Sequence, residues 1–244
     1  MDFNNYLNSL LEQHNIPHAS CIPLSECEVI HKHKLDRCNF SEGDELFVCM
    51  MTIPYYTKSP RTNISDYAKS RDYHLFCDMF IGDILQKLRK ELPEYKFFGF
   101  YDNSPIEEVT AALKAGLGVL GENNLLITEK YSSYVFLCEI ITNYPVPVSA
   151  DMQIKHCHGC GKCRSLCPKE ECGVCLSSLT QKKGELTEHE KQSIKNTATR
   201  GGAIYVRSAV RTLCVPKRAE QYTQTLNFSK PTARTLLAYP SLKV

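Results

Sequence analysis

One feature constrains this chain more than any other, a run of closely spaced cysteines closed by a proline: Cys157, Cys160, Cys163, Cys167 and Pro168. The spacing, C-x2-C-x2-C-x3-C-P, is the one with which ferredoxin-type proteins of bacteria bind iron-sulfur clusters, with three thiolates on one cluster and the fourth on a second. Three sulfurs that must meet at one small cube need this close spacing. Gly159 and Gly161 let the backbone fold around the cube without a Cβ in the way.

Zinc is the alternative metal for this run, since C-x2-C pairs also form tetrahedral zinc sites. Zinc sites usually separate two such pairs by a long spacer, so the spacing favours iron and sulfur. The chain has thirteen cysteines, and residues 1–5 lack the basic and apolar segments of a signal peptide. We therefore expect a cytoplasmic protein whose cysteines serve metal or redox chemistry rather than disulfides.

Charge and hydropathy exclude some partners. No apolar run approaches the roughly 20 residues that span a bilayer, so no membrane partner is expected. The net charge of +2 creates no strong field toward nucleic acid. After Gly201, however, seven Lys and Arg stand against one acid, Glu220. This basic stretch either meets phosphates or is a solvated tail.

The pattern of apolar residues predicts a layered α/β domain over residues 1–150. Helical spacing appears at residues 3–14 and again at 66–92, where Ser65 would cap the helix. Strands are predicted at 46–53, 96–101, 125–128 and 134–142, the first of them buried on both faces. Residues 31–34 are interpreted as a solvated loop, and the isolated cysteines as buried apolar residues or idle thiols: Cys21, Cys27, Cys38 and Cys49.

A junction after the strand at 96–101 holds the first candidate catalytic residue, Asp102. Ser104 fits an N-cap, Pro105 the first helical position and Glu107 the third, which together predict a capping box and a helix reaching residue 115. Asp102 would then lie between a strand and a helix N-terminus. Such a carboxylate is either a structural turn acceptor or a proton donor in a pocket.

Three glycines follow that helix, at Gly116, Gly118 and Gly121. Their density suggests that the backbone approaches a large ligand closely. They close a helix instead of opening one after a strand, so they are not a dinucleotide-binding fingerprint.

Five segments, taken in order before the cysteine run, resemble the epoxyqueuosine reductase family: residues 64–68, 71–74, 102–105, 114–121 and 136–142. The resemblance implies a cobalamin-binding α/β domain related to reductive dehalogenases, followed by a ferredoxin-like 4Fe-4S domain, here at 151–216. Residues 217–244 are predicted from their charge to be a basic tail. The resemblance also implies queuosine biosynthesis by tRNA modification: an oxidoreductase that reduces the epoxide of epoxyqueuosine in the anticodon loop.

The same resemblance implies roles for individual residues. Asp102 would be the proton donor at the upper face of the corrinoid, in place of a turn residue. Tyr73 and His74 would line that pocket, although an ordinary core or surface histidine remains the alternative for His74. The glycines Gly116, Gly118 and Gly121 would pass beside the corrin. Ferredoxin or flavodoxin would supply the electrons.

The chain departs from the family pattern downstream of the cysteine run. A lone cysteine is matched by Cys175, but in the second group of the family only Cys214 is present, because Arg207 and Val210 occupy the places of two cysteines. One complete cluster remains, and we predict its ligands to be Cys157, Cys160, Cys163 and Cys214. The other cluster would keep only Cys167 and Cys175, with Cys172 as a substitute.

Two classes of function therefore stay open. One is a corrinoid- and iron-sulfur-dependent reductase of the epoxyqueuosine type. The other is a non-catalytic or electron-carrying paralogue with one remaining cluster. The loss of two cysteines favours the carrier, and the retained pocket segments favour the reductase.

Overall fold

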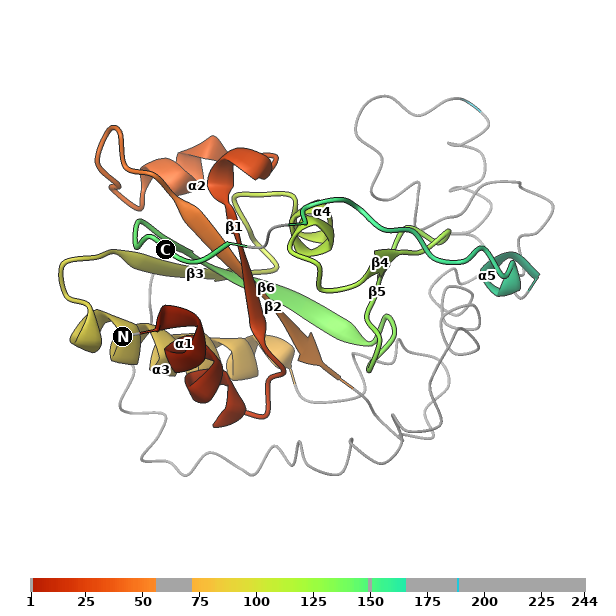
Figure 1. The fold of residues 1–244 in the computed structure, drawn as a ribbon, viewed down its shortest axis with the longest axis horizontal. Coiled ribbons are helices and arrows are strands. Elements are labelled where there is room, and N and C mark those ends of the chain that lie inside the picture. Colours follow the sequence, from red (N-terminus) through yellow and green to blue (C-terminus); the bar gives the residue numbers. More distant parts are fainter. Residues whose placement is uncertain (1, 56–71, 149–150, 166–187, 189–244) are drawn as a thin grey trace.

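The computed structural model describes residues 2–55, 72–148, 151–165 and 188. Its centre is a four-stranded sheet in the order β1-β2-β6-β3, in which all neighbouring strands are antiparallel (Figure 1). The four strands are β1 (Ala19–Pro23), β2 (Phe47–Pro54), β3 (Phe97–Tyr101) and β6 (Val135–Thr142). Two short strands, β4 (Val119–Leu120) and β5 (Leu126–Ile127), form a separate small sheet.

Helices cover both faces of the large sheet. On one face lie α1 (Phe3–Glu12) and α3 (Tyr73–Glu91), side by side below the sheet in Figure 1. The other face packs against α4 (Glu108–Lys114) and residues of α2 (Lys32–Asp36). A 3-10 turn (Leu24–Glu26) follows β1, and α5 (Lys162–Ser165) lies in the cysteine run. The predicted mixed α/β layering is confirmed.

Strand β2 is covered on both faces, which explains its apolar sequence. All eight of its residues are buried. Cys49 and Met51 belong to the core cluster shared with α1 and α3, whereas Val48 and Met50 belong to the cluster shared with α4. Side chains alternate between the two faces of a strand, so a strand covered on both faces needs an unbroken apolar run. The prediction for residues 46–53 is confirmed.

Other boundaries differ from the prediction. The long helix begins at Tyr73, and not near residue 66, because Asp72 is its N-cap and accepts a hydrogen bond from His74 N. Ser65, the predicted cap, lies outside the described residues. Residues 32–36 form the helix α2 where a loop was expected. Strand β1 was missed, since its five residues end in a proline and only two of them are fully buried.

The isolated cysteines are structural, as expected. Cys21 and Cys49 lie opposite each other on β1 and β2, both buried, with their sulfurs 2.6 Å apart. Burial raises the pKa of Cys27 to about 12 and that of Cys38 to about 11. Thiols held neutral by desolvation are poor nucleophiles and metal ligands.

Candidate active site

A turn at the end of β3 presents Asp102. Its φ of +58° lies in the left-handed region, which aspartate tolerates better than most residues. The side chain of Asp102 is 61% exposed. The tight turn directs this side chain away from the core, so the carboxyl lies open to solvent at the end of the apolar strand β3.

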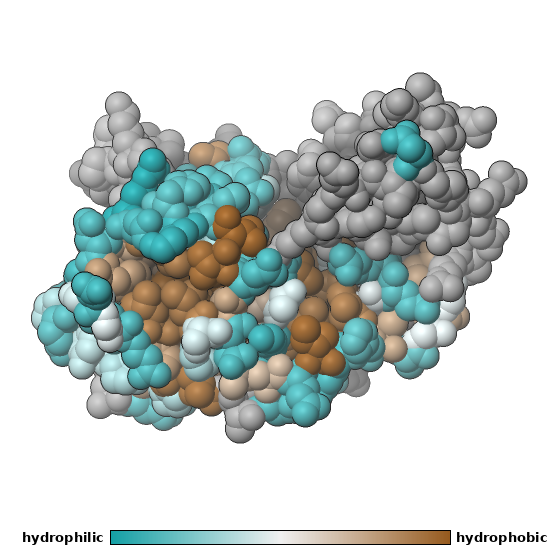
Figure 2. Space-filling view, turned by 90° about the horizontal axis from the view of Figure 1, so that it is seen from above, coloured by the Kyte–Doolittle hydropathy of each residue, from teal (hydrophilic) through white to brown (hydrophobic). Residues whose placement is uncertain are grey.

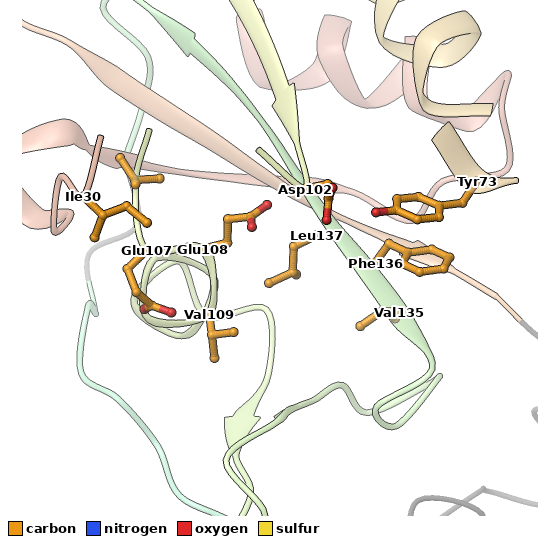
Figure 3. A pocket seen from close by; sticks show the side chains of 10 residues that line it. Ile30, Tyr73, Asp102, Glu107, Glu108, Val109, Val135, Phe136 and Leu137 are labelled. Atoms are coloured by element: carbon orange, nitrogen blue, oxygen red, sulfur yellow. The ribbon is translucent and has the colours of Figure 1, made fainter. Parts of the chain in front are cut away.

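Asp102 borders a cavity of about 370 Å³ between α3, α4 and β6 (Figure 3). The opposite walls are an aromatic pair and aliphatic side chains. The rings of Tyr73 and Phe136 stack with centroids 4.1 Å apart and an interplanar angle of 9°. The structure thus brings together Tyr73 and Asp102, two of the residues singled out from the sequence. The cavity is lined by Ile30, Tyr73, Asp102, Ile106, Glu107, Glu108, Val109, Val135, Phe136 and Leu137.

His74 lies at the edge of this site between two carboxylates. Its Nδ1 is 2.6 Å from Asp72 Oδ1, and its Nε2 is 3.4 Å from Asp102 Oδ2. The hydrogen bond with Asp72, with a smaller contribution from Asp102, raises the pKa of His74. An imidazole held in this way keeps a positive charge next to Asp102 to a higher pH than a free histidine does.

Tyr73 is linked to Asp102 from the other side. Burial raises the pKa of the Tyr73 phenol, and the negative charge of Asp102 and a hydrogen bond to it raise the pKa further. The phenol therefore stays neutral and donates a hydrogen bond to the Asp102 carboxylate. Asp102 thus has one aromatic donor and one imidazole as its neighbours.

The capping box predicted at Ser104 is wrong. Ser104 is buried, and its hydroxyl accepts from Ile106 N and donates to Glu139 Oε1 at 2.5 Å. Glu107 is the N-cap instead, accepting a hydrogen bond from Thr110 N at 2.7 Å. Helix α4 consequently starts at Glu108, later than predicted.

Sequence reasoning also missed two buried carboxyls, Glu108 and Glu139. Desolvation, together with the nearby negative charges of Asp102 and Glu107, raises the pKa of Glu108 to about 7. Glu139 is fully buried in the central strand β6, where desolvation raises its pKa strongly. An acidic residue inside an otherwise apolar strand was the available signal for Glu139.

The glycines lie apart from the lining of this cavity, and two of them, Gly118 and Gly121, lie against β5. Gly116 ends α4 with φ +77°, and a Cβ on Gly118 would lie 2.5 Å from the carbonyl oxygen of Ile127. A Cβ on Gly121 would collide with Asn123. The sequence predicted that the backbone at these glycines approaches a ligand closely. At Gly118 and Gly121 the backbone instead lies close to other residues of the same chain.

Three cysteines of the run border a second cavity, of about 320 Å³: Cys157, Cys160 and Cys163. Gly159 and Gly161 have φ of +65° and +70°, which confirms that this loop needs glycine at both positions. Within the described ranges, no three His, Cys, Asp or Glu side chains are grouped as a metal site. The other predicted ligands lie outside those ranges: Cys167, Cys175 and Cys214.

The cysteine run is joined to the small sheet through Leu120. Leu120 N donates to Lys155 O at 2.8 Å, and Cys157 N donates to Leu120 O at 2.9 Å. Residues 155–157 therefore extend the edge of β4 as a parallel bridge. The glycine segment between α4 and β5 is thus the part of the α/β domain that contacts the first cysteine.

Apolar side chains reach the surface close to the first cavity. Val29 and Ile30 are 40% and 42% exposed, and Ile30 N and His31 N both donate to Pro105 O. The space-filling view shows apolar residues gathered on one face and bordered by hydrophilic ones (Figure 2).

Among the described residues, no helix has both the length and the apolar composition needed to cross a bilayer.

No family model matches the chain. Curated relatives do match. An epoxyqueuosine reductase of Aliivibrio fischeri is 31% identical over 175 residues, 68% of this chain and 46% of that protein. Those of Pseudomonas aeruginosa and Bacillus cereus are 31% and 32% identical, over 54% and 59% of this chain and 35% and 38% of theirs. The chain thus spans less than half the length of these relatives.

Solved structures show the same fold. The epoxyqueuosine reductase of Streptococcus thermophilus superposes with a TM-score of 0.61 over 88% of this chain and 68% of that one, at 19% identity. A structure of such an enzyme with an epoxyqueuosine-modified tRNA stem loop superposes with a TM-score of 0.50 over 78% of this chain and 61% of that one, at 20% identity. A Bacillus subtilis structure, with its catalytic aspartate loop swung out of the active site, covers 78% of this chain and 60% of that one with a TM-score of 0.51 and 20% identity.

Proposed function

Because the chain belongs to the epoxyqueuosine reductase family, we propose that it reduces the epoxide of epoxyqueuosine in a tRNA anticodon loop to give queuosine. The observation that carries this proposal is that Tyr73 and Asp102 line one cavity, with His74 beside Asp102 at its edge. A relative solved with an epoxyqueuosine-modified stem loop supports tRNA as the partner. The protein would act in the cytoplasm, where tRNA is modified.

Asp102 is the proton donor in this proposal. Reductive removal of an epoxide oxygen consumes two electrons and two protons and releases water, so an acid must lie near the leaving oxygen. Tyr73 and His74 hold the Asp102 carboxyl from two sides. The exposure of Asp102 means that it becomes an effective acid when ligands close the cavity against water, because desolvation favours the neutral carboxyl.

Cobalamin is the cofactor proposed for this cavity. The stacked pair Tyr73 and Phe136, with aliphatic walls from α4 and β6, suits the face of a macrocycle. When bound, low-valent cobalt would supply the nucleophile or reductant that attacks the strained C–O bond. The relation to reductive dehalogenases belongs to the same proposal. Gly116, Gly118 and Gly121 would lie on the side of the cavity toward the cysteine run.

One 4Fe-4S cluster is proposed in a ferredoxin-like domain at 151–216, with Cys157, Cys160, Cys163 and Cys214 as ligands. The shared cavity of the first three cysteines, and the two left-handed glycines between them, suit a cluster of this kind. The second cluster is incomplete, with Cys167 and Cys175 as its remaining ligands. Electrons would come from a ferredoxin or flavodoxin.

An electron-carrying paralogue is the second candidate, favoured by the presence of Arg207 and Val210 where the family pattern has cysteines. Such a protein would keep one cluster and would not need an acid in the first cavity. Whether activity depends on Asp102 therefore distinguishes the reductase from the electron carrier.

The deciding experiment compares the full-length protein with Asp102→Asn, both reconstituted anaerobically with iron, sulfide and cobalamin. The substitution preserves shape and removes the proton, so turnover of an epoxyqueuosine-containing tRNA should be lost while iron and cobalamin contents stay equal. Wild-type turnover by the variant would remove Asp102 from the mechanism. Absence of cobalamin binding and turnover in the unsubstituted protein would favour the carrier.

A further inference from the structure

A second acid enters the cavity of Asp102 from the first turn of α4. Glu108 projects from that helix into the cavity, on the side where Asp102 lies (Figure 3). Its Oε1 is buried and has no hydrogen-bond partner. A buried carboxylate oxygen left without a donor costs free energy, and the cost falls when the group carries a proton.

Behind Glu108 lies a second carboxyl in the same condition. Glu139 Oε1 accepts the hydroxyl of Ser104, while Glu139 Oε2 is buried without a partner. Ser104 comes two residues after Asp102, so its hydroxyl ties the Asp102 turn to the central strand. The charge of Glu108 disfavours ionisation of Glu139.

The charges around Glu108 are mainly negative. Asp102 in the turn and Glu107, the N-cap of α4, repel a negative charge at this position, and Glu139 on β6 is a neighbouring acid. Tyr73 on α3 and Cys138 on β6 face it as neutral groups whose pKa values it raises.

One cation, Lys34 of α2, acts in the opposite direction. Its Nζ is held by the turn itself, since it donates to Asn103 O at 3.0 Å and also to the Asn103 side chain. Lys34 is engaged with Asn103, and His74 lies between Asp72 and Asp102, so neither cation is hydrogen-bonded to the buried Oε1 of Glu108.

We infer that Glu108 stores the proton that reloads Asp102 between turnovers, an inference that rests on the proposed function. After Asp102 has given its proton to the leaving oxygen, the O–H bond of Glu108 breaks and the Asp102 carboxylate gains that proton, directly or through one water. No electron changes hands in this step. Glu108, which is only half-buried, then regains a proton from solvent at the mouth of the cavity.

Glu108 can store a proton at pH values near neutral. Burial and the neighbouring acids hold the pKa of Glu108 at about 7, so near that pH both of its protonation states are populated. A carboxyl poised near the working pH can both give and take up a proton. Glu108 acts through Asp102, so we regard it as a positioning residue rather than a catalytic one.

Infrared titration of the full-length protein tests the inference without requiring turnover. We expect a carbonyl-stretch band of a neutral carboxylic acid that disappears near pH 7 in the unsubstituted protein and is missing in Glu108→Gln. In Asp102→Asn the band should disappear at lower pH, because a negative charge that opposes ionisation of Glu108 is gone. Glu107→Gln is a comparison at the start of the same helix. It should keep the band, because Glu107 has its own partner in Thr110 N, but the band should disappear at lower pH, because the charge of Glu107 also opposes ionisation of Glu108.

Turnover then separates this inference from the proposed function. Glu108→Gln should complete a first turnover at the normal rate and slow later ones by about tenfold or more, with Glu108→Asp restoring part of the loss. A band that persists in Glu108→Gln, or that is unmoved in Asp102→Asn, would overturn the coupling. Equal multiple-turnover rates and pH profiles in Glu108→Gln and the unsubstituted protein would overturn the storage role. If the unsubstituted protein shows the expected bands but no turnover, the proposed reductase function is rejected, while the electrostatic coupling between Glu108 and Asp102 stands.

Discussion

Glu108→Gln should make the folded protein more stable at alkaline pH and leave it unchanged at acid pH. The carboxyl has a pKa of about 7 in the folded protein against an ordinary value of 4.5. The folded state therefore binds more protons than the unfolded state between these values, and the free energy of unfolding falls as the pH rises through that window. Below pH 4 both states are protonated, and the carboxyl adds no pH dependence.

The size of the effect follows from the same two values. Each pKa unit of difference corresponds to about 1.36 kcal/mol, so above pH 8 the ionised Glu108 lowers the free energy of unfolding by about 3 kcal/mol. A glutamine of the same shape cannot ionise and avoids this cost. Total stabilities of about 5–15 kcal/mol make such a gain easy to measure. For a chain of this size it corresponds to a rise in Tm of roughly 6–12 °C.

Urea unfolding of the full-length protein at pH 4, 6 and 8 measures the difference directly. Glu129→Gln is the control, because Glu129 is exposed and its carboxylate is solvated in both states. The control should match the unsubstituted protein within a few tenths of a kcal/mol at every pH. A stabilisation by Glu108→Gln that is equal at pH 4 and pH 8, or one that shrinks as the pH rises, would refute the reasoning.

Three further outcomes are expected. Gly118→Ala should destabilise the protein by about 1–3 kcal/mol in thermal unfolding, because the new Cβ meets backbone atoms of β5. In Gly116→Ala the new Cβ meets no atom, so only the cost of a left-handed alanine is expected, about 1–2 kcal/mol. A larger loss for Gly116→Ala than for Gly118→Ala would contradict the packing argument. Cys214→Ser should lower iron from about four atoms per chain to near zero after anaerobic reconstitution, and eight irons in the unsubstituted protein would disprove the single-cluster prediction. Asp72→Asn should lower the pKa of His74 in an NMR titration, since the hydrogen bond with Asp72 is the main cause of its elevation; an unchanged titration would assign the elevation to Asp102.

The sequence predicted those parts of the fold that are set by local patterns. Strand β2 was found because both faces are covered and the run is apolar without interruption. The start of α4 was misplaced because Ser104 fits two patterns equally well, a helix cap and a hydroxyl bonded to a buried acid. The acid in question, Glu139, is contributed by a strand 35 residues further along the chain. Such a partner is visible only once the strands are placed.

The candidate site was predictable to a similar degree. The resemblance located Asp102 and Tyr73, which the structure places at one cavity. Neither pattern nor resemblance indicated that Glu108 is the desolvated acid and Asp102 the exposed one, because burial depends on how the turn and α4 meet. Gly118 and Gly121 are positions of close approach, but their neighbours in the structure are Ile127 of β5 and Asn123, whereas Gly116 has open space beside it.

The position of β6 has a consequence for how the chain folds during synthesis. β6 is the last of the four strands in sequence, yet it lies between β2 and β3 and pairs with both. The apolar strand β2 therefore waits for roughly 90 residues, or about 4 to 18 s at usual ribosomal speeds, with β1 as its only strand partner in the sheet. Contacts this far apart in sequence form slowly and leave an aggregation-prone edge open meanwhile. Cys157 follows the end of β6 by about 15 residues. The cysteine run therefore leaves the ribosome after all four strands of the sheet have been synthesised and can pair.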